Sequence, residues 1–148
     1  MKKITVLLGL AFLAFSCSSD DDGSSPEDLV GVWQFTERTI DGVLDEDIDG
    51  CTLEETITFT EDEFIDSNYE LNNGVCEFVE QDVDPYTASS TTITFDFSDE
   101  DEEEMLTTVS YSINGPILII SFVDELEDND GELTGETEDI VTSFTRVE

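Results

Sequence analysis

Hydrophobic and polar residues alternate with a period of two along most of the chain, which is the pattern of strands that bury one face. In Leu53–Thr60, positions 53, 57 and 59 are apolar, whereas positions 54, 56, 58 and 60 are polar. The next run carries Ile65, Tyr69 and Leu71 on one face. Spacing typical of a helix is nearly absent. The pattern therefore predicts an all-β domain.

Segments of this kind follow one another with short turns between them. Thr60-Glu61-Asp62-Glu63 and Asn114-Gly115 are turn sequences of the kind that join antiparallel neighbours. Ile117–Val123 is apolar on both faces, which predicts the most buried strand or, as the alternative, an interaction surface. About eight such strands form an up-and-down barrel or, as the alternative, a β-sandwich. The predicted strands are residues 30–40, 53–60, 64–71, 75–81, 86–97, 105–113, 117–123 and 140–147.

The first 16 residues have the layout of a secretory signal peptide. Met1, Lys2 and Lys3 form a basic start, and an apolar run from Ile4 to Phe15 follows. That run is shorter than the roughly 20 apolar residues that span a bilayer. We therefore expect residues 1–16 to be removed on export.

The next residues predict a lipid anchor. Ala14-Phe15-Ser16-Cys17 resembles a bacterial lipobox, in which the cysteine is acylated and becomes the new N-terminus. Residues 18–22 read Ser-Ser-Asp-Asp-Asp and resemble the tract that directs some lipoproteins to the outer face of the outer membrane. We expect an outer-membrane lipoprotein facing the cell exterior, with residues 17–28 as an acidic flexible tether and residues 29–148 as the folded domain.

The charge and the residue types of the chain exclude several classes of function. The chain has 39 Asp and Glu against 4 Lys and Arg, no histidine, and a formal net charge of −35. Such a chain is repelled by nucleic acid and by anionic lipid headgroups. Without histidine there is no Ser/His or Cys/His catalysis, and Arg38 and Arg146 are the only basic residues after the signal peptide. We expect a non-catalytic, monomeric protein.

Cys51 and Cys76 remain once Cys17 is assigned to the anchor. An even pair of cysteines in an exported protein most simply forms a disulfide. A metal site would need more soft ligands, and a nucleophilic thiol would need a neighbouring base or cation.

One acidic segment matches the start of a calcium-binding loop. Asp45, Asp47 and Asp49, followed by Gly50, reproduce the Asp-x-Asp-x-Asp-Gly opening, but the twelfth position is Thr56 in place of a bidentate glutamate. Calcium is thus the only cofactor the sequence suggests. The competing hypothesis that follows is a structural or adhesive surface module with calcium-stabilised acidic loops.

Several short motifs in a fixed order resemble small bacterial lipocalin-like lipoproteins. These motifs are Gly31-Val32-Trp33, the pair Cys51 and Cys76, residues 56–64, residues 86–95 and the closing Phe144-Thr145-Arg146-Val147. The resemblance implies a barrel with a closed floor, where Gly31 and Trp33 lie and Arg146 crosses the tryptophan ring.

The resemblance also implies a cup, which either holds a small apolar ligand or is filled by its own side chains. In a barrel, the inward-facing residues would be Phe59, Phe95, Phe97, Tyr111, Ile120 and Phe122. The leading hypothesis is a surface-anchored lipoprotein that binds a small apolar ligand or a partner.

Overall fold

The computed structural model describes residues 24–98, 105–127 and 133–147. The predicted signal peptide, Cys17 and most of the predicted tether lie outside these residues. The described elements are the helix α1 (Pro26–Leu29), the 3₁₀ turn η1 (Thr52–Glu54) and the strands β1 (Gly31–Ile40), β2 (Val43–Leu44), β3 (Thr56–Phe59), β4 (Glu63–Asn72), β5 (Val75–Ala88), β6 (Thr92–Asp96), β7 (Leu106–Asn114), β8 (Ile117–Glu127) and β9 (Leu133–Val147).

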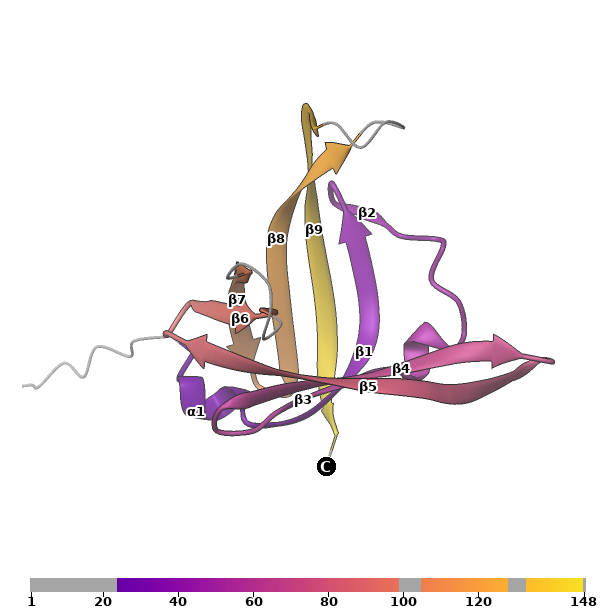
Figure 1. Ribbon diagram of the computed structural model, residues 1–148, viewed down its shortest axis with the longest axis horizontal. Coiled ribbons are helices and arrows are strands. Elements are labelled where there is room, and N and C mark those ends of the chain that lie inside the picture. The colour runs from indigo at the N-terminus through magenta and orange to yellow at the C-terminus, as the bar shows by residue number, and fades with distance from the viewer. Residues whose placement is uncertain (1–23, 99–104, 128–132, 148) are drawn as a thin grey trace, which may run out of the picture.

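The strands form a closed antiparallel barrel. Their order is β2-β1-β3-β4-β5-β6-β7-β8-β9, and β1 also pairs with β9. The pairing of β1 with β9 closes a ring of eight strands, and β2 adds a short ninth strand at the far end of β1 (Figure 1). The predicted up-and-down barrel is therefore confirmed, in place of the alternative sandwich. In the described part of the chain, no helix has the length and apolar character needed to cross a bilayer.

Several predicted strands have different bounds, and the predicted strand 75–81 continues to Ala88 as β5. Residues 53 and 54 lie in η1, so β3 begins only at Thr56. The predicted strand 86–97 is two strands, because Ser89 makes a turn: its hydroxyl accepts from Thr92 N at 3.0 Å and its own N–H donates to Thr92 O at 2.8 Å. The last strand begins at Leu133, well before residue 140.

Only one of the two apolar faces of β8 is buried, although its sequence predicts the most buried strand. Leu118 and Ile120 are buried on the inner face, whereas Val123 on the outer face is 60% exposed. A barrel wall has solvent on its outside, so apolar residues there stay partly exposed whatever their hydrophobicity.

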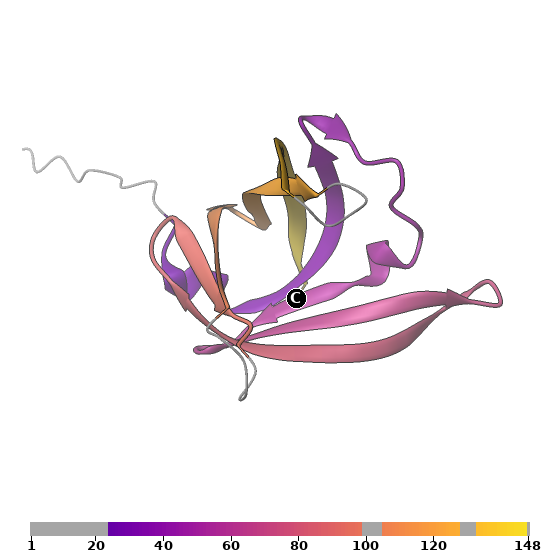
Figure 2. The ribbon, with the colours of Figure 1, turned by 45° about the horizontal axis from the view of Figure 1, so that its top comes forward.

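The barrel is tightly joined at one end and opens at the other. β3 pairs with β1 only over Gly31–Gln34, and β8 pairs with β7 only over Ser110–Asn114. Beyond these ladders, β8, β9 and β1 continue as one wall, while β4 and β5 extend as a long hairpin past the barrel (Figures 1 and 2). We call the joined end the floor and the open end the mouth.

The core lies at the floor. Ser25 caps α1, accepting from Glu27 N, and Pro26 stands in the first turn, where its missing N–H costs nothing. The short helix places Leu29 across the floor, fully buried. Leu29, Trp33, Phe59, Ile93 and Leu118 are all at most 1% exposed.

A disulfide joins two segments on the mouth side. Cys51 and Cys76 are bonded, with their Cα atoms 5.3 Å apart. The bond fastens the loop before η1 to the β4–β5 hairpin, so the predicted pairing is confirmed.

Candidate ligand-binding cavity

A cavity of about 320 Å³ lies inside the barrel toward the mouth. Side chains of alternate residues on six strands point into it, because successive residues of a strand face opposite sides of the sheet. Phenylalanine dominates the lining. The cavity is lined by Ile57, Phe64, Asp66, Phe95, Phe97, Thr107, Val109, Ile120, Phe122, Thr142 and Phe144.

Aromatic rings shape one wall of the cavity. The rings of Phe64 and Phe95 lie 4.7 Å apart between centroids, and the rings of Phe95 and Phe97 stack at 5.7 Å with an interplanar angle of 20°. Phe97 and Phe122 are each 37% exposed. These rings contact one another along the wall and leave the space between the walls unfilled.

The sequence placed most of the inner apolar residues correctly. Of the six side chains expected inside, Phe95, Phe97, Ile120 and Phe122 line the cavity. The other two, Phe59 and Tyr111, are buried in the core. The Tyr111 hydroxyl donates to Ser89 O at 2.7 Å, which fixes it to the β5–β6 turn.

Phe64 and Asp66 line the cavity, although the alternation along β4 placed the opposite face of this strand inside. Alternation assigned Ile65, Tyr69 and Leu71 to one apolar face of β4, but Phe64 and Asp66 are the residues that line the cavity, and Leu71 is 62% exposed. The run begins with two apolar residues, Phe64 and Ile65, so either face fits the pattern. The short turn between β3 and β4 could have identified the inner face. It pairs Phe59 with Phe64, and cross-strand partners share a face.

A smaller cavity of about 170 Å³ adjoins the first and shares Ile57, Asp66, Thr142 and Phe144 with it. Its remaining lining is more polar and consists of Phe35, Arg38, Thr52 and Glu55. Burial raises the pKa of the Glu55 carboxyl, and the charges of Asp66 and Asp49 add to this, while Arg38 lowers it.

The carboxylates of the calcium-like segment hold the loop itself. Asp45 lies 2.6 Å from an Arg38 nitrogen and accepts from Asp47 N at 3.0 Å; these two contacts lower the pKa of Asp45. Asp49 accepts from Cys51 N and Thr52 N at 2.8 and 2.9 Å, which lowers its pKa too.

The structure therefore does not gather Asp45, Asp47 and Asp49 into one set of ligands. Within residues 24–98, 105–127 and 133–147, no group of three or more His, Cys, Asp or Glu is arranged to hold a metal ion. Asp45 and Asp49 shape the connection that leads to the disulfide at Cys51.

At the floor, Gly31, Trp33 and Arg146 lie together. The Arg146 guanidinium carbon is 4.2 Å from the centroid of the Trp33 ring, within cation–π range. The Trp33 indole N–H donates to Leu29 O at 2.7 Å. Gly31 has φ +147°, and a Cβ there would lie 2.6 Å from an Arg146 nitrogen, so a side chain at this position would displace the arginine.

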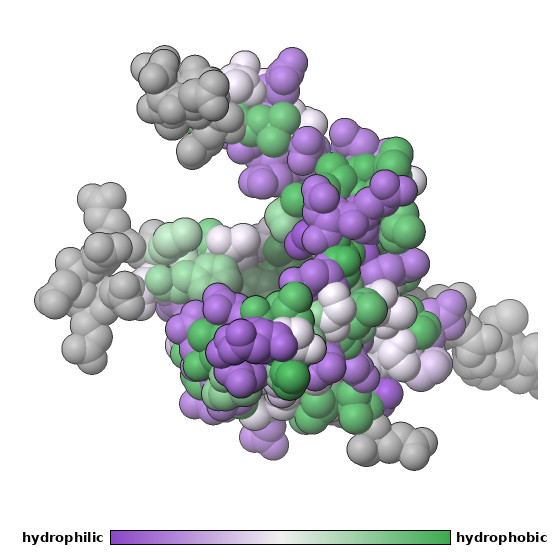
Figure 3. All heavy atoms as spheres, turned by 90° about the vertical axis from the view of Figure 1, so that its right-hand side faces the viewer, coloured by the Kyte–Doolittle hydropathy of each residue, from purple (hydrophilic) through white to green (hydrophobic). Residues whose placement is uncertain are grey.

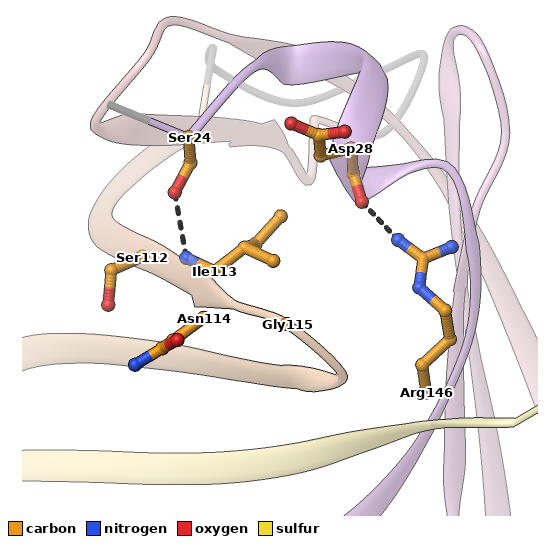
Figure 4. A pocket seen from close by; sticks show the side chains of 7 residues that line it. All are labelled: Ser24, Asp28, Ser112, Ile113, Asn114, Gly115 and Arg146. Atoms are coloured by element: carbon orange, nitrogen blue, oxygen red, sulfur yellow. Dashed lines mark hydrogen bonds between the residues drawn. The ribbon is translucent and has the colours of Figure 1, made fainter. Parts of the chain in front are cut away.

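The same arginine fastens the segment before β1 to the barrel. It donates to Val30 O at 3.0 Å and also to Asp28 O, and Ser24 Oγ accepts from Ile113 N at 2.7 Å (Figure 4). The shallow polar hollow around these groups is lined by Ser24, Asp28, Ser112, Ile113, Asn114, Gly115 and Arg146. The hydrogen bonds of Ser24 and Arg146 in this hollow hold the segment before β1 against the floor.

No curated protein and no solved structure matches the chain significantly. The lipocalin-like domain family matches residues 29–145, which is most of the chain and all of the barrel up to the final residues of β9. The chain therefore belongs to the lipocalin-like domain family.

Proposed function

We propose that this protein is a non-catalytic, monomeric lipoprotein that holds a small apolar molecule in the cavity near the mouth of its barrel. Lipocalin-like barrels are generally binding modules rather than enzymes. The observation that carries the proposal is the unfilled, phenylalanine-lined cavity of about 320 Å³. This volume lies at the lower end of the range of about 300–1,000 Å³ that small-molecule sites occupy.

The cavity is open enough for a ligand to enter. The ladder between β7 and β8 ends at Ser110 and Ser121, so Thr107 and Phe122 lie where the two strands have separated. A second hollow between these strands also contains Thr107 and Phe122. Viewed with the tip of the β4–β5 hairpin toward the reader, the molecule is hollowed between the hairpin and the strands that rise beyond it, with hydrophobic residues in the hollow (Figure 3).

Blocking the cavity tests ligand binding. Thr107→Trp places a large side chain in the cavity lining, and we expect it to weaken the binding of N-phenyl-1-naphthylamine at least about tenfold, measured by the rise of the probe's fluorescence. For the wild type we expect a dissociation constant of about 1–100 μM, because a small ligand gains only a limited free energy per atom.

The matched control is Ser112→Trp, five residues along β7 on its exposed outer face and outside the lining of both the cavity and the second hollow. It should leave the affinity for the probe unchanged. Equal probe binding by Thr107→Trp and the wild type, or no binding by the wild type, would contradict the proposal.

A lipid anchor at Cys17 would set the orientation of the barrel. Only residues 18–23 separate Cys17 from Ser24, which contacts the floor, and seven residue steps span at most about 25 Å. An acylated Cys17 would thus hold the floor toward the membrane and leave the mouth facing outward. We place the protein on the outer face of the outer membrane, as the Ser-Ser-Asp-Asp-Asp tract suggests.

Metabolic labelling tests the anchor. We expect the wild type to incorporate labelled palmitate and Cys17→Ala to lose the label, because the thiol is the site of diacylation. Ser18→Ala keeps the thiol and should stay labelled. Label retained by Cys17→Ala would refute the anchor, and protection of the domain from protease added to intact cells would refute its outward placement.

A further inference from the structure

The apolar cavity has one charged residue in its lining. Of the eleven residues that surround it, eight are hydrophobic, two are threonines, and the last is Asp66. Because Asp66 also lines the smaller cavity, its carboxyl group stands where the apolar space meets the more polar one. A ligand that fills the apolar space therefore meets a carboxylate at its end.

Other carboxylates surround Asp66. Asp82 is its direct partner across the β4–β5 ladder, and Asp84 pairs with Phe64, so both lie on the same face as Asp66. Glu55 lines the adjoining cavity. The one cation there, Arg38, is held by Asp45 through contacts of 2.8 and 2.6 Å. These six groups are five acids and one arginine, so the surroundings of Asp66 are acidic.

This environment disfavours an ionised Asp66 in the empty protein. Burial raises the pKa of the Asp66 carboxyl, and Asp82 and Asp84 raise it further, whereas the backbone N–H of Ser67 lowers it. A cation bound beside the carboxylate would offset both the desolvation and the repulsion.

The aromatic lining also favours a cation. Phe64, Phe95, Phe97, Phe122 and Phe144 present rings around the same cavity. Ring faces attract ammonium groups, most strongly where water is excluded. A cavity lined by aromatic rings and one carboxylate suits a ligand that has a protonated amine attached to an apolar group.

We infer that the ligand is an apolar molecule carrying an ammonium group, which pairs with Asp66 while its apolar part fills the cavity. This inference rests on the proposed function and names the class of ligand. An anionic head in the same place would face the carboxyl groups of Asp66 and Glu55, with Asp82 and Asp84 on the neighbouring strand, and would be repelled.

Three probes with the same chain length and different heads test the inference: decylamine, decanol and decanoate, each used to displace N-phenyl-1-naphthylamine. At neutral pH and 150 mM salt we expect decylamine to bind at least about tenfold more tightly than decanol, because hydrogen bonds to charged groups are the stronger ones. Decanoate should bind most weakly.

Asp66→Asn should remove the preference for the amine and keep the affinity for decanol. Glu63→Gln is the matched control, because it removes one negative charge from an exposed position on the same strand. It should retain the tenfold preference, which separates a contact in the cavity from attraction to the acidic surface. A preference that survives in Asp66→Asn would overturn the inference.

The pH dependence gives a second measurement. As the pH falls through the raised pKa of Asp66, the carboxyl gains a proton and decylamine affinity should fall, while decanol affinity should stay constant. Asp66→Asn should lose this part of the pH dependence. Equal affinities for decylamine and decanol would refute the ammonium class and leave the proposed function intact, whereas failure of all three probes and of N-phenyl-1-naphthylamine would refute the proposed function itself.

Discussion

Replacing Trp33 by alanine is expected to lower the free energy of unfolding by about 3–5 kcal/mol, the range typical of a large aromatic side chain lost from a core. Trp33 is fully buried, and its indole N–H donates to Leu29 O at 2.7 Å. Its ring also supports the guanidinium of Arg146, which holds Val30 O and Asp28 O. The substitution therefore leaves a cavity, removes the hydrogen bond to Leu29 O and removes the cation–π partner of Arg146.

Denaturant unfolding followed by far-ultraviolet circular dichroism measures this effect. Fluorescence is unsuitable because Trp33 is the only tryptophan of the chain. Trp33→Phe should cost less than Trp33→Ala, since it keeps a ring but loses the indole N–H. The control Val43→Ala changes a residue that is 70% exposed and should shift the free energy by no more than about 0.5 kcal/mol. A loss below about 1 kcal/mol in Trp33→Ala would contradict the role of Trp33 at the floor.

Removing the disulfide with the double variant Cys51→Ala and Cys76→Ala is expected to lower the free energy of unfolding by roughly 3–4 kcal/mol. The two cysteines are 25 positions apart, and the bond restricts the unfolded chain by closing that loop. Alanine is the better replacement for Cys51, which is 1% exposed, because a serine there would bury a hydroxyl group.

Reduction of the wild type is the matched control for the double variant. A reducing agent should lower the wild-type melting temperature about as much as the double variant does, and it should leave the double variant unchanged. If the reduced wild type melted at the same temperature as the oxidised protein, the bond would not stabilise the domain.

The order of the strands could be predicted from the sequence because alternation and turn residues are local signals. Asn114-Gly115 does join β7 to β8, and Thr60–Glu63 does join β3 to β4. The division of 86–97 was missed, since the Ser89 turn depends on a side-chain hydrogen bond that the hydrophobic pattern does not reveal. The length of β9 was underestimated because residues 133–139 are mainly polar and are ordered by pairing with β8.

The aromatic lining of the cavity was also predictable, but its charged residue was not. Phe95 in β6 and Phe97, just after the end of that strand, are two positions apart in extended chain, so the alternation placed them on one face. Asp66 looked like one more surface acid among 39 acidic residues, and only the pairing of Phe59 with Phe64 reveals its face. Asp45 and Asp49 resembled metal ligands because sequence spacing does not show that Arg38 and nearby N–H groups already bind them.

The pairing of β1 with β9 has a consequence for how the chain folds. Arg146 reaches the carbonyl of Val30 across 116 positions of sequence, and the ring of strands cannot close before β9 has arrived. Forming contacts between such distant residues costs the entropy of closing a long loop, which makes folding slow. During synthesis, β1 therefore emerges early and stays without its final neighbour, β9, until the end. In that interval the many like charges of the chain would keep incompletely folded molecules apart.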